Sequence, residues 1–289
     1  MMQRENQDFS VQALRIAVDE VLQALAPKLE GFVPRVFIVL GSGLGALARS
    51  VEEVASFTFA EIPHFPEPKV ESHHGRLVFG KLGGQKVAVM SGRFHLYEGH
   101  APQSWIPPVR AMRKLGCETM LVTNAAGALH AGLKVPSLMI IRDHINGLAR
   151  SPLCGPNDDE VGPRFPDMTE VYDPKLRELL HAAARENNLS VSEGVYWGTL
   201  GPTFETAAEV KMMASLGADA VGMSTISEVI IARHCGMKIA GVSSITNATA
   251  GVATTPQTME EVIAGGAALA KGLKGLVEGF LRKLNESAE

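Results

Sequence analysis

The chain has 289 residues, of which 46% are hydrophobic and 20% are charged, and its formal net charge is −4. A chain of this length and composition can bury a large core, either as one α/β domain or as two small ones. The slightly acidic balance excludes a basic surface for nucleic acid and a polybasic patch for a membrane, so neither partner is expected.

Cysteine usage and the start of the chain indicate a cytoplasmic location. Cys117, Cys154 and Cys235 are widely separated, odd in number and form no CxxC pair, which favours reduced thiols over a disulfide framework. The first eight residues are polar and acidic where a secretory signal would need an apolar region. Residues 239–259 lack charge but are rich in serine, threonine, asparagine and glycine, so we expect a strand and a loop there instead of a membrane helix.

The apolar pattern predicts helices and strands in alternation. A helix is expected over 11–29, because residues 11, 14, 18, 21, 22 and 25 share one helical face. Residues 35–40 read as a buried strand, which Gly41-Ser-Gly-Leu-Gly45 connects to a helix over 46–51. Further strands are expected at 76–82, 86–90, 119–122, 138–142, 195–200, 218–221 and 238–243. Helical patterns lie at 102–115, 174–188, 206–216 and 227–235, and a long amphipathic helix closes the chain over 259–285.

This alternation predicts an α/β fold with a mainly parallel sheet that is covered on both faces. No Pro/Ser-rich linker, shift in composition or internal repeat divides the chain, so residues 1–289 are expected to form a single domain with an N-terminal helical segment over 1–30. Residues 151–167 form a long irregular insertion, and such insertions in compact domains tend to be functional.

The segment from Ser91 to Glu98 carries the most chemistry. It follows the apolar run 87–90, and Gly92 marks the end of that strand. If the chain stays extended, Arg93, His95 and Tyr97 alternate toward one side, with Glu98 close behind. An obligate cation, an imidazole and a phenol at a strand end suit an anion beside a hydroxylated substrate. A solvated edge strand is the alternative.

Three glycine-rich or histidine-rich turns are candidate ligand loops. Gly41-Ser-Gly-Leu-Gly45 offers backbone amides and a hydroxyl at a helix N-terminus, which suits an anion. A dinucleotide site is the rival, with a second strand over 54–59 that ends at Glu61, but the spacing lacks the final glycine of GxGxxG. Ser72-His-His-Gly-Arg76 offers two imidazoles, which are either ligands or solvated surface groups. Thr123-Asn-Ala-Ala-Gly127 permits close approach of a ligand or is a plain turn.

Two motifs of similar form place polar side chains before helices. In Gly201-Pro-Thr-Phe-Glu-Thr206, a capping box from Thr206 to Glu209 leaves Glu205 free to accept from a base that stacks on Phe204. In Gly222-Met-Ser-Thr-Ile-Ser-Glu228, a capping box from Thr225 to Glu228 leaves the Ser224 hydroxyl at a helix N-terminus.

A further amide follows the strand at 238–243. The carboxamide of Asn247 can both donate and accept a hydrogen bond. All of these segments lie at or beside the carboxyl ends of predicted strands, where open α/β sheets bind their ligands. Their side chains include no plausible metal cluster and no carboxylate pair of the kind that glycosidases use.

The motifs GSGLG, GRFHxYEG, TNAAG, GPxFET, GMS and TN occur together in one order, and in this the chain resembles the purine nucleoside phosphorylase and methylthioadenosine phosphorylase family, trimeric type, from about residue 33 to about 284. The resemblance implies a single domain with a mixed central sheet flanked by helices, which amends the parallel arrangement. It also implies a transferase that converts a purine nucleoside and phosphate into free base and ribose 1-phosphate. The expected assembly is a homotrimer that needs no metal or organic cofactor.

The resemblance also assigns roles to residues. Phosphate is expected on Ser42, His73, Arg93, the Ala125 backbone amide and Ser224, and the H-x-G-R frame selects His73 over His74. The expected catalytic residues are His95, Glu205 and Asn247, with Glu205 on the purine N1 side and Asn247 on the 6-oxo group and N7. The other expected substrate contacts are Tyr97 and Met223 on the sugar, Phe204 and Val221 on the base, and Phe165 from a neighbouring subunit.

Two positions refine the expected specificity. An amide at Asn247 favours 6-oxopurines such as inosine and guanosine, because methylthioadenosine phosphorylases carry an aspartate there that receives a 6-amino group. Met259 stands where the family usually has a histidine beside the ribose 5′-hydroxyl. Two other functions stay open: a nicotinamide-dependent oxidoreductase built on GSGLG and Glu61, and a non-catalytic purine-binding protein.

Overall fold

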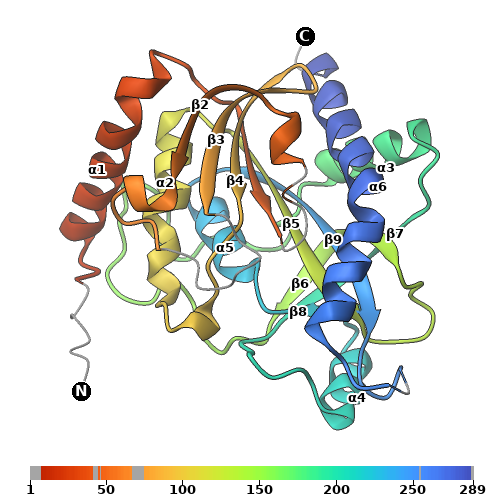
Figure 1. Cartoon of the computed structure of the whole chain (residues 1–289). Helices are drawn as coiled ribbons and strands as arrows, with labels where there is room; N and C mark the ends of the chain where they lie inside the picture. The colour runs from red at the N-terminus through yellow and green to blue at the C-terminus, as the bar shows by residue number, and fades with distance from the viewer. Residues whose placement is uncertain (1–7, 42–44, 46, 67–74, 254, 288–289) are drawn as a thin grey trace.

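The computed structural model describes residues 8–41, 45, 47–66, 75–253 and 255–287. It consists of a mixed sheet with helices packed on both faces (Figure 1). Across the described ranges, none of the helices combines the length and apolarity that a membrane span would require.

The sheet has an open half and a closed half that share strand β5. Its order is β2(Glu52–Thr58), β3(Arg76–Leu82), β4(Gln85–Ser91), β1(Val36–Leu40), β5(Thr119–Ala128), β8(Ala220–Gly222), β7(Val191–Gly198), β6(Ser137–Asn146) and β9(Lys238–Ala248). Because β9 also pairs with β5, the strands from β5 to β9 in this order close into a barrel.

The mixed sheet implied by the resemblance is confirmed, because antiparallel pairs accompany the parallel pairs that the alternation predicted. Strand β3 runs antiparallel to β2 and β4, and β5–β8 and β6–β9 are also antiparallel pairs. The reason at β3 and β4 is local: only Gly83 and Gly84 separate the two strands, and a connection this short cannot hold a crossover. Both glycines have positive φ, 55° and 80°, which a tight hairpin requires.

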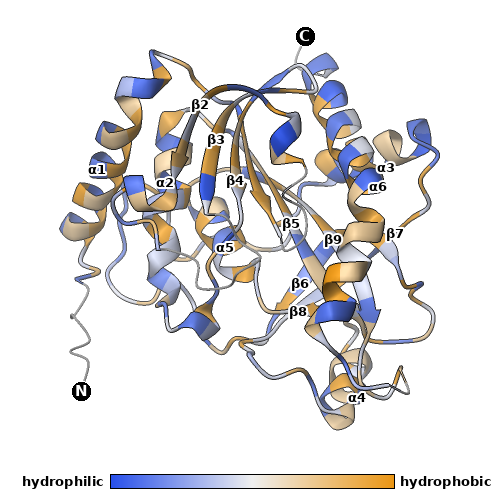
Figure 2. Cartoon of the chain, in the orientation of Figure 1, coloured by the Kyte–Doolittle hydropathy of each residue, from blue (hydrophilic) through white to orange (hydrophobic). Residues whose placement is uncertain are grey.

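Two apolar layers cover the sheet. Helices α1(Val11–Leu29), α2(Ile106–Leu115) and α5(Ile226–His234) contribute to one core cluster. Helices α3(Pro174–Glu186) and α6(Met259–Glu286) contribute to the other, and they pack on each other. The short α4(Ala207–Ser215) covers a small cluster beside β8. Figure 2 shows apolar strands between helices whose outer faces are hydrophilic, which is the pattern that drives this layering.

Most predicted elements are present with shifted ends. Helix α1 has the predicted bounds, whereas β5 and β9 continue through the TNAAG and TN motifs, which were expected to follow the strands. The two strands pair with each other along this extension, so the backbone N–H and C=O groups of its small residues form hydrogen bonds within the sheet. The helix predicted over 46–51 is wrong in the described part, which contains a 3-10 turn, Ala48–Ser50.

The second strand of the dinucleotide hypothesis exists as β2, but it lies at the sheet edge and pairs antiparallel to β3. Glu61 does not face a nucleotide crevice. Its carboxylate accepts from the Thr58 backbone at 2.6 Å and pairs with Lys28 at 3.0 Å, and these contacts lower its pKa to about 2. Glu61 therefore stabilises a turn and contacts helix α1, so the dinucleotide hypothesis lacks its ribose-binding acid.

Candidate active site

A cavity of about 390 Å³ opens where β4, β5 and β9 end. Its volume lies within the usual range for small-molecule sites. The wall includes eleven of the predicted site residues: Arg93, His95, Tyr97, Ala125, Phe204, Glu205, Val221, Met223, Ser224, Asn247 and Met259. These residues span the sequence from Arg93 to Met259, so the fold brings the motifs together as the strand-end argument predicted.

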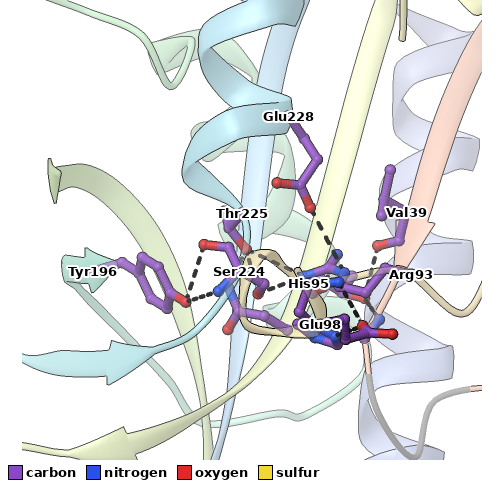
Figure 3. Close-up of polar contacts among 11 residues, drawn as sticks. Val39, Arg93, His95, Glu98, Tyr196, Ser224, Thr225 and Glu228 are labelled. Carbon is purple, nitrogen blue, oxygen red and sulfur yellow. Dashed lines mark hydrogen bonds and ion pairs between the residues drawn. The ribbon is translucent and has the colours of Figure 1, made fainter. Parts of the chain in front are cut away.

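Arg93 is a buried cation in the cavity wall. It follows the turn at Gly92, and its side chain is only 1% exposed. One terminal nitrogen donates to the Ser224 hydroxyl at 2.7 Å, and the other donates to the Thr123 carbonyl at 2.8 Å (Figure 3). Together with a longer contact of 3.4 Å to the Thr225 hydroxyl, these contacts fix the plane of the guanidinium and leave one terminal N–H group for an anion in the cavity.

Glu228 is the carboxylate beside this cation. Its Oε1 lies 3.7 Å from the Arg93 Nε, and both side chains are at most 2% exposed (Figure 3). Burying an arginine alone is unfavourable, so the pair keeps the guanidinium in the wall before any anion binds. Sequence reasoning missed this role because it assigned Glu228 to a helix cap.

That predicted capping box, from Thr225 to Glu228, is wrong. Thr225 has a φ of 76° and makes no side-chain cap. Its hydroxyl instead accepts from the Asn124 amide at 2.9 Å and lies 3.4 Å from an Arg93 nitrogen. A left-handed conformation costs energy for a β-branched residue, so the contacts to buried polar groups hold it there.

The Ser224 backbone is held by Tyr196, a residue that the motifs did not single out. The Ser224 N–H donates to the Tyr196 hydroxyl at 3.3 Å, and burial raises the pKa of that phenol to about 12. Tyr196 thus stays neutral and keeps the Ser224 hydroxyl directed toward Arg93.

His95 and Tyr97 form the next part of the wall. Their rings stack with centroids 4.8 Å apart and an interplanar angle of 12°. The Glu98 carboxylate accepts from the His95 backbone at 2.6 Å and lies 3.0 Å from its Nδ1. Because an ionised carboxylate only accepts, Nδ1 carries a proton in this pair. The chain here turns as a 3-10 helix, Leu96–Glu98, so the strictly extended alternation is wrong although all three side chains reach the cavity.

Asn247 lies at a bulge in β9. Ala126 pairs with Ile245 and Gly127 pairs with Asn247, so Thr246 is the extra residue that redirects the following side chain. Gly127 allows this packing, because a Cβ at 127 would lie 3.4 Å from the Asn247 Nδ2 and 2.7 Å from a Thr249 methyl group. The side chain of Asn247 is 3% exposed and accepts from the Thr246 hydroxyl at 2.9 Å.

Phe204 and Glu205 of the GPTFET motif form another side of the cavity. The capping box from Thr206 to Glu209 is confirmed, which leaves Glu205 outside the cap. Burial raises the pKa of the Glu205 carboxyl above its usual range, and the negative charge of Glu209 adds to the effect. Phe204 is 37% exposed, so one part of its ring is open to a ligand.

The start of α6 completes the cavity. Thr258 caps the helix by accepting from the Glu261 N–H at 3.2 Å, and Met259 is the first helical residue, as predicted. Met259 is 41% exposed and lines the cavity with Val262. Gln257 also lines it and accepts from Asn247, a contact that no sequence motif indicated.

Three predicted site residues are not among those that the structure places in the cavity wall. Ser42 and His73 lie outside the described residues. Phe165 is described, but it is 87% exposed and does not line the cavity. Its loop is anchored by Asp158, which is 2% exposed and pairs with Arg15 at 2.6 Å. The insertion is therefore held on the body of the protein while Phe165 projects from it.

The cysteine thiols do not line the cavity. Cys117 and Cys235 are buried, Cys154 is exposed, and all three are free. Across the same ranges, no three histidine, cysteine, aspartate or glutamate side chains gather as a metal site.

Comparisons with known proteins agree on one family. The model of the Phosphorylase superfamily matches residues 35–282. Purine nucleoside phosphorylase 1 of Geobacillus stearothermophilus is 47% identical over 249 residues, which cover 86% of this chain and 90% of that protein. A structure of Schistosoma mansoni purine nucleoside phosphorylase in complex with inosine superposes with a TM-score of 0.85 at 40% identity, covering 93% of this chain and 96% of the other. One in complex with adenosine gives 0.84 at 42% identity, with 92% and 96% covered.

Proposed function

We propose that different parts of the cavity bind phosphate and the purine base in this chain, which belongs to the Phosphorylase superfamily. The chain is an enzyme that cleaves the N-glycosidic bond of purine nucleosides such as inosine and guanosine with phosphate, and it releases free purine and ribose 1-phosphate. The observation that carries the proposal is the buried Arg93, whose guanidinium meets Ser224 at one end of a cavity that has Glu205 and Asn247 in its wall.

Phosphate binds at the Arg93 end. The guanidinium and the Ser224 hydroxyl donate to its oxygens, and the backbone amide of Ala125 is a further proposed donor. The anion then lies beside C1′ of the ribose, where it stabilises the positive charge that develops as the glycosidic bond stretches. One phosphate oxygen forms the new bond to C1′, and the electron pair of the old bond moves to the purine.

The opposite end stabilises the leaving base. Asn247 binds the 6-oxo group and N7, and Glu205 accepts from N1–H while negative charge builds on the ring. Phe204 and Val221 pack against the base, and Tyr97 and Met223 against the sugar. His95 lies between phosphate and ribose, where the Glu98 carboxylate, 3.0 Å from its Nδ1, orients the ring.

The test is phosphate dependence. Purified protein is incubated with inosine, with and without phosphate, and the products are separated by chromatography. We expect hypoxanthine and ribose 1-phosphate only when phosphate is present, because Arg93 provides an anion site and the chemistry needs an anionic nucleophile. Equal cleavage in phosphate-free buffer would identify a hydrolase and would refute the proposal.

The assembly, location and cofactor requirement are part of the same proposal. The enzyme works as a homotrimer in which Phe165 enters a neighbouring site, and the exposure of this ring supports that arrangement. It works in the cytoplasm, in keeping with its three free thiols. It uses phosphate as co-substrate and needs no metal or organic cofactor, since Arg93 supplies the charge that phosphate binding requires.

A further inference from the structure

The carboxamide of Gln257 contacts the carboxamide of Asn247 in the cavity wall. Asn247 Nδ2 donates to Gln257 Oε1 at 3.1 Å, and a longer contact of 3.4 Å joins it to the Ala248 carbonyl. On the other side, the Thr246 hydroxyl donates to Asn247 Oδ1 at 2.9 Å. The amide of Asn247 is therefore held between a side chain of its own strand and one from the loop before α6.

Both partners can serve the opposite orientation of this amide. The Thr246 hydroxyl lies 3.4 Å from the Ala126 carbonyl, so it can donate there and accept from Asn247 Nδ2 instead. Gln257 carries both a carbonyl and an amino group, and turning its amide exchanges donor for acceptor. A half-turn of Asn247 together with Gln257 thus exchanges the hydrogen bonds to Gln257 and Thr246, and it gives up only the 3.4 Å contact to the Ala248 carbonyl.

The two orientations suit different purines. A 6-oxo base needs a donor at position 6, and its N7 gains a proton as the base leaves, so N7 then needs an acceptor. A 6-amino base needs an acceptor at position 6, and it needs a donor at N7 as long as N7 is unprotonated, which is the usual way an asparagine reads adenine. The direction in which the Asn247 amide points therefore decides which base is matched.

We propose that Gln257 is a positioning residue that sets the orientation of the Asn247 amide and thereby the selectivity between 6-oxo and 6-amino purine nucleosides. The inference rests on the proposed function, in which Asn247 contacts position 6 and N7. Glutamine at 257 permits both orientations, whereas a side chain that only accepts or only donates permits one.

The experiment compares Gln257→Glu with Gln257→Lys. Glutamate only accepts, so it keeps Asn247 Nδ2 toward position 257, and lysine only donates, so it draws Oδ1 there. We expect the ratio of kcat/KM for inosine to kcat/KM for adenosine to shift in opposite directions in the two variants. Each shift should be about five- to tenfold, the usual effect of one hydrogen bond. The ratio cancels the fraction of folded enzyme and any effect of the new charge that both substrates share.

A matched control exists outside the cavity. Gln85 Nε2 donates to Asn285 Oδ1 at 3.2 Å, so Gln85→Glu and Gln85→Lys alter a second glutamine–asparagine pair without touching the site. Their selectivity ratio should equal that of the wild type.

For variants that are too slow for kinetics, calorimetry measures the affinities for hypoxanthine and adenine. The ratio of these affinities should also shift in opposite directions in the two variants. Shifts of both variants in one direction, or unchanged ratios, would overturn the inference if inosine cleavage by the wild type depends on phosphate. A wild type that cleaves inosine without phosphate would instead refute the proposed function.

Discussion

Removal of the Arg93 guanidinium is the most informative perturbation of the phosphate end. Of its four terminal N–H groups, three donate to Ser224, Thr225 and Thr123, so one remains for phosphate. A hydrogen bond to a charged group contributes about 1.5–3 kcal/mol, so Arg93→Ala should lose about 1.5–3 kcal/mol of phosphate binding in the transition state. This corresponds to a fall of roughly tenfold to 150-fold in kcat/KM for phosphate.

The neighbouring carboxylate complicates the single variant. Glu228 would be left buried without its cation, and breaking such a pair typically costs about 3–5 kcal/mol of stability. The double variant Arg93→Ala/Glu228→Gln removes that unpaired charge, so it should recover thermal stability without recovering phosphate use.

The assay measures initial rates at saturating inosine over a range of phosphate, with circular dichroism as the check on folding. Arg35→Ala is the control, because Arg35 forms an exposed pair with Glu118 away from the cavity. A folded Arg93→Ala whose kcat/KM for phosphate stays within tenfold of the wild type would show that another group holds the anion.

Four further predictions concern the base, the sugar and the assembly. Asn247→Asp should shift preference from inosine toward adenosine by about 1–3 kcal/mol, and an equal loss on both nucleosides would contradict the role of that amide. Met259 is expected beside the ribose 5′-hydroxyl, and a thioether cannot donate a hydrogen bond, so kcat/KM for 5′-deoxyinosine should stay within about 150-fold of that for inosine. A larger difference would mean that another group binds the hydroxyl. Phe165→Ala should raise KM for inosine in a protein that light scattering measures as a trimer, and an active monomer would refute the shared site. Burial raises the pKa of Glu205, so activity on inosine should be complete above that raised pKa and fall as pH drops through it; Glu205→Gln should abolish this acidic limb in the pH profile.

The sequence alone was enough to predict most of the helices and strands and most of the residues that line the cavity. Helix α1 and the start of α6 follow from apolar spacing and from caps that involve residues three positions apart, and such local signals do not depend on the rest of the fold. The motifs lie at strand ends, which was enough to predict that Arg93, Glu205 and Asn247 share one site.

The tertiary structure alone decided how segments distant in sequence meet. A T-x-x-E pattern occurs at Thr206 and again at Thr225, but only the first forms a capping box. At Thr225 the buried Arg93 competes for the same groups: it draws the Glu228 carboxylate and the threonine hydroxyl away from the helix end. A local pattern cannot reveal this competition, because Arg93 lies 132 positions earlier in the chain.

The same reason explains the closed half of the sheet and the contact of Gln257. The pairing of β5 with β9 and the bulge at Thr246 depend on where two strands from different parts of the chain come into register. Gln257 acquires its role only because that bulge turns Asn247 toward the loop before α6. Local apolar spacing and caps are contained in the sequence, whereas a hydrogen bond between two amides exists only once the chain has folded and excluded the water that would otherwise satisfy both.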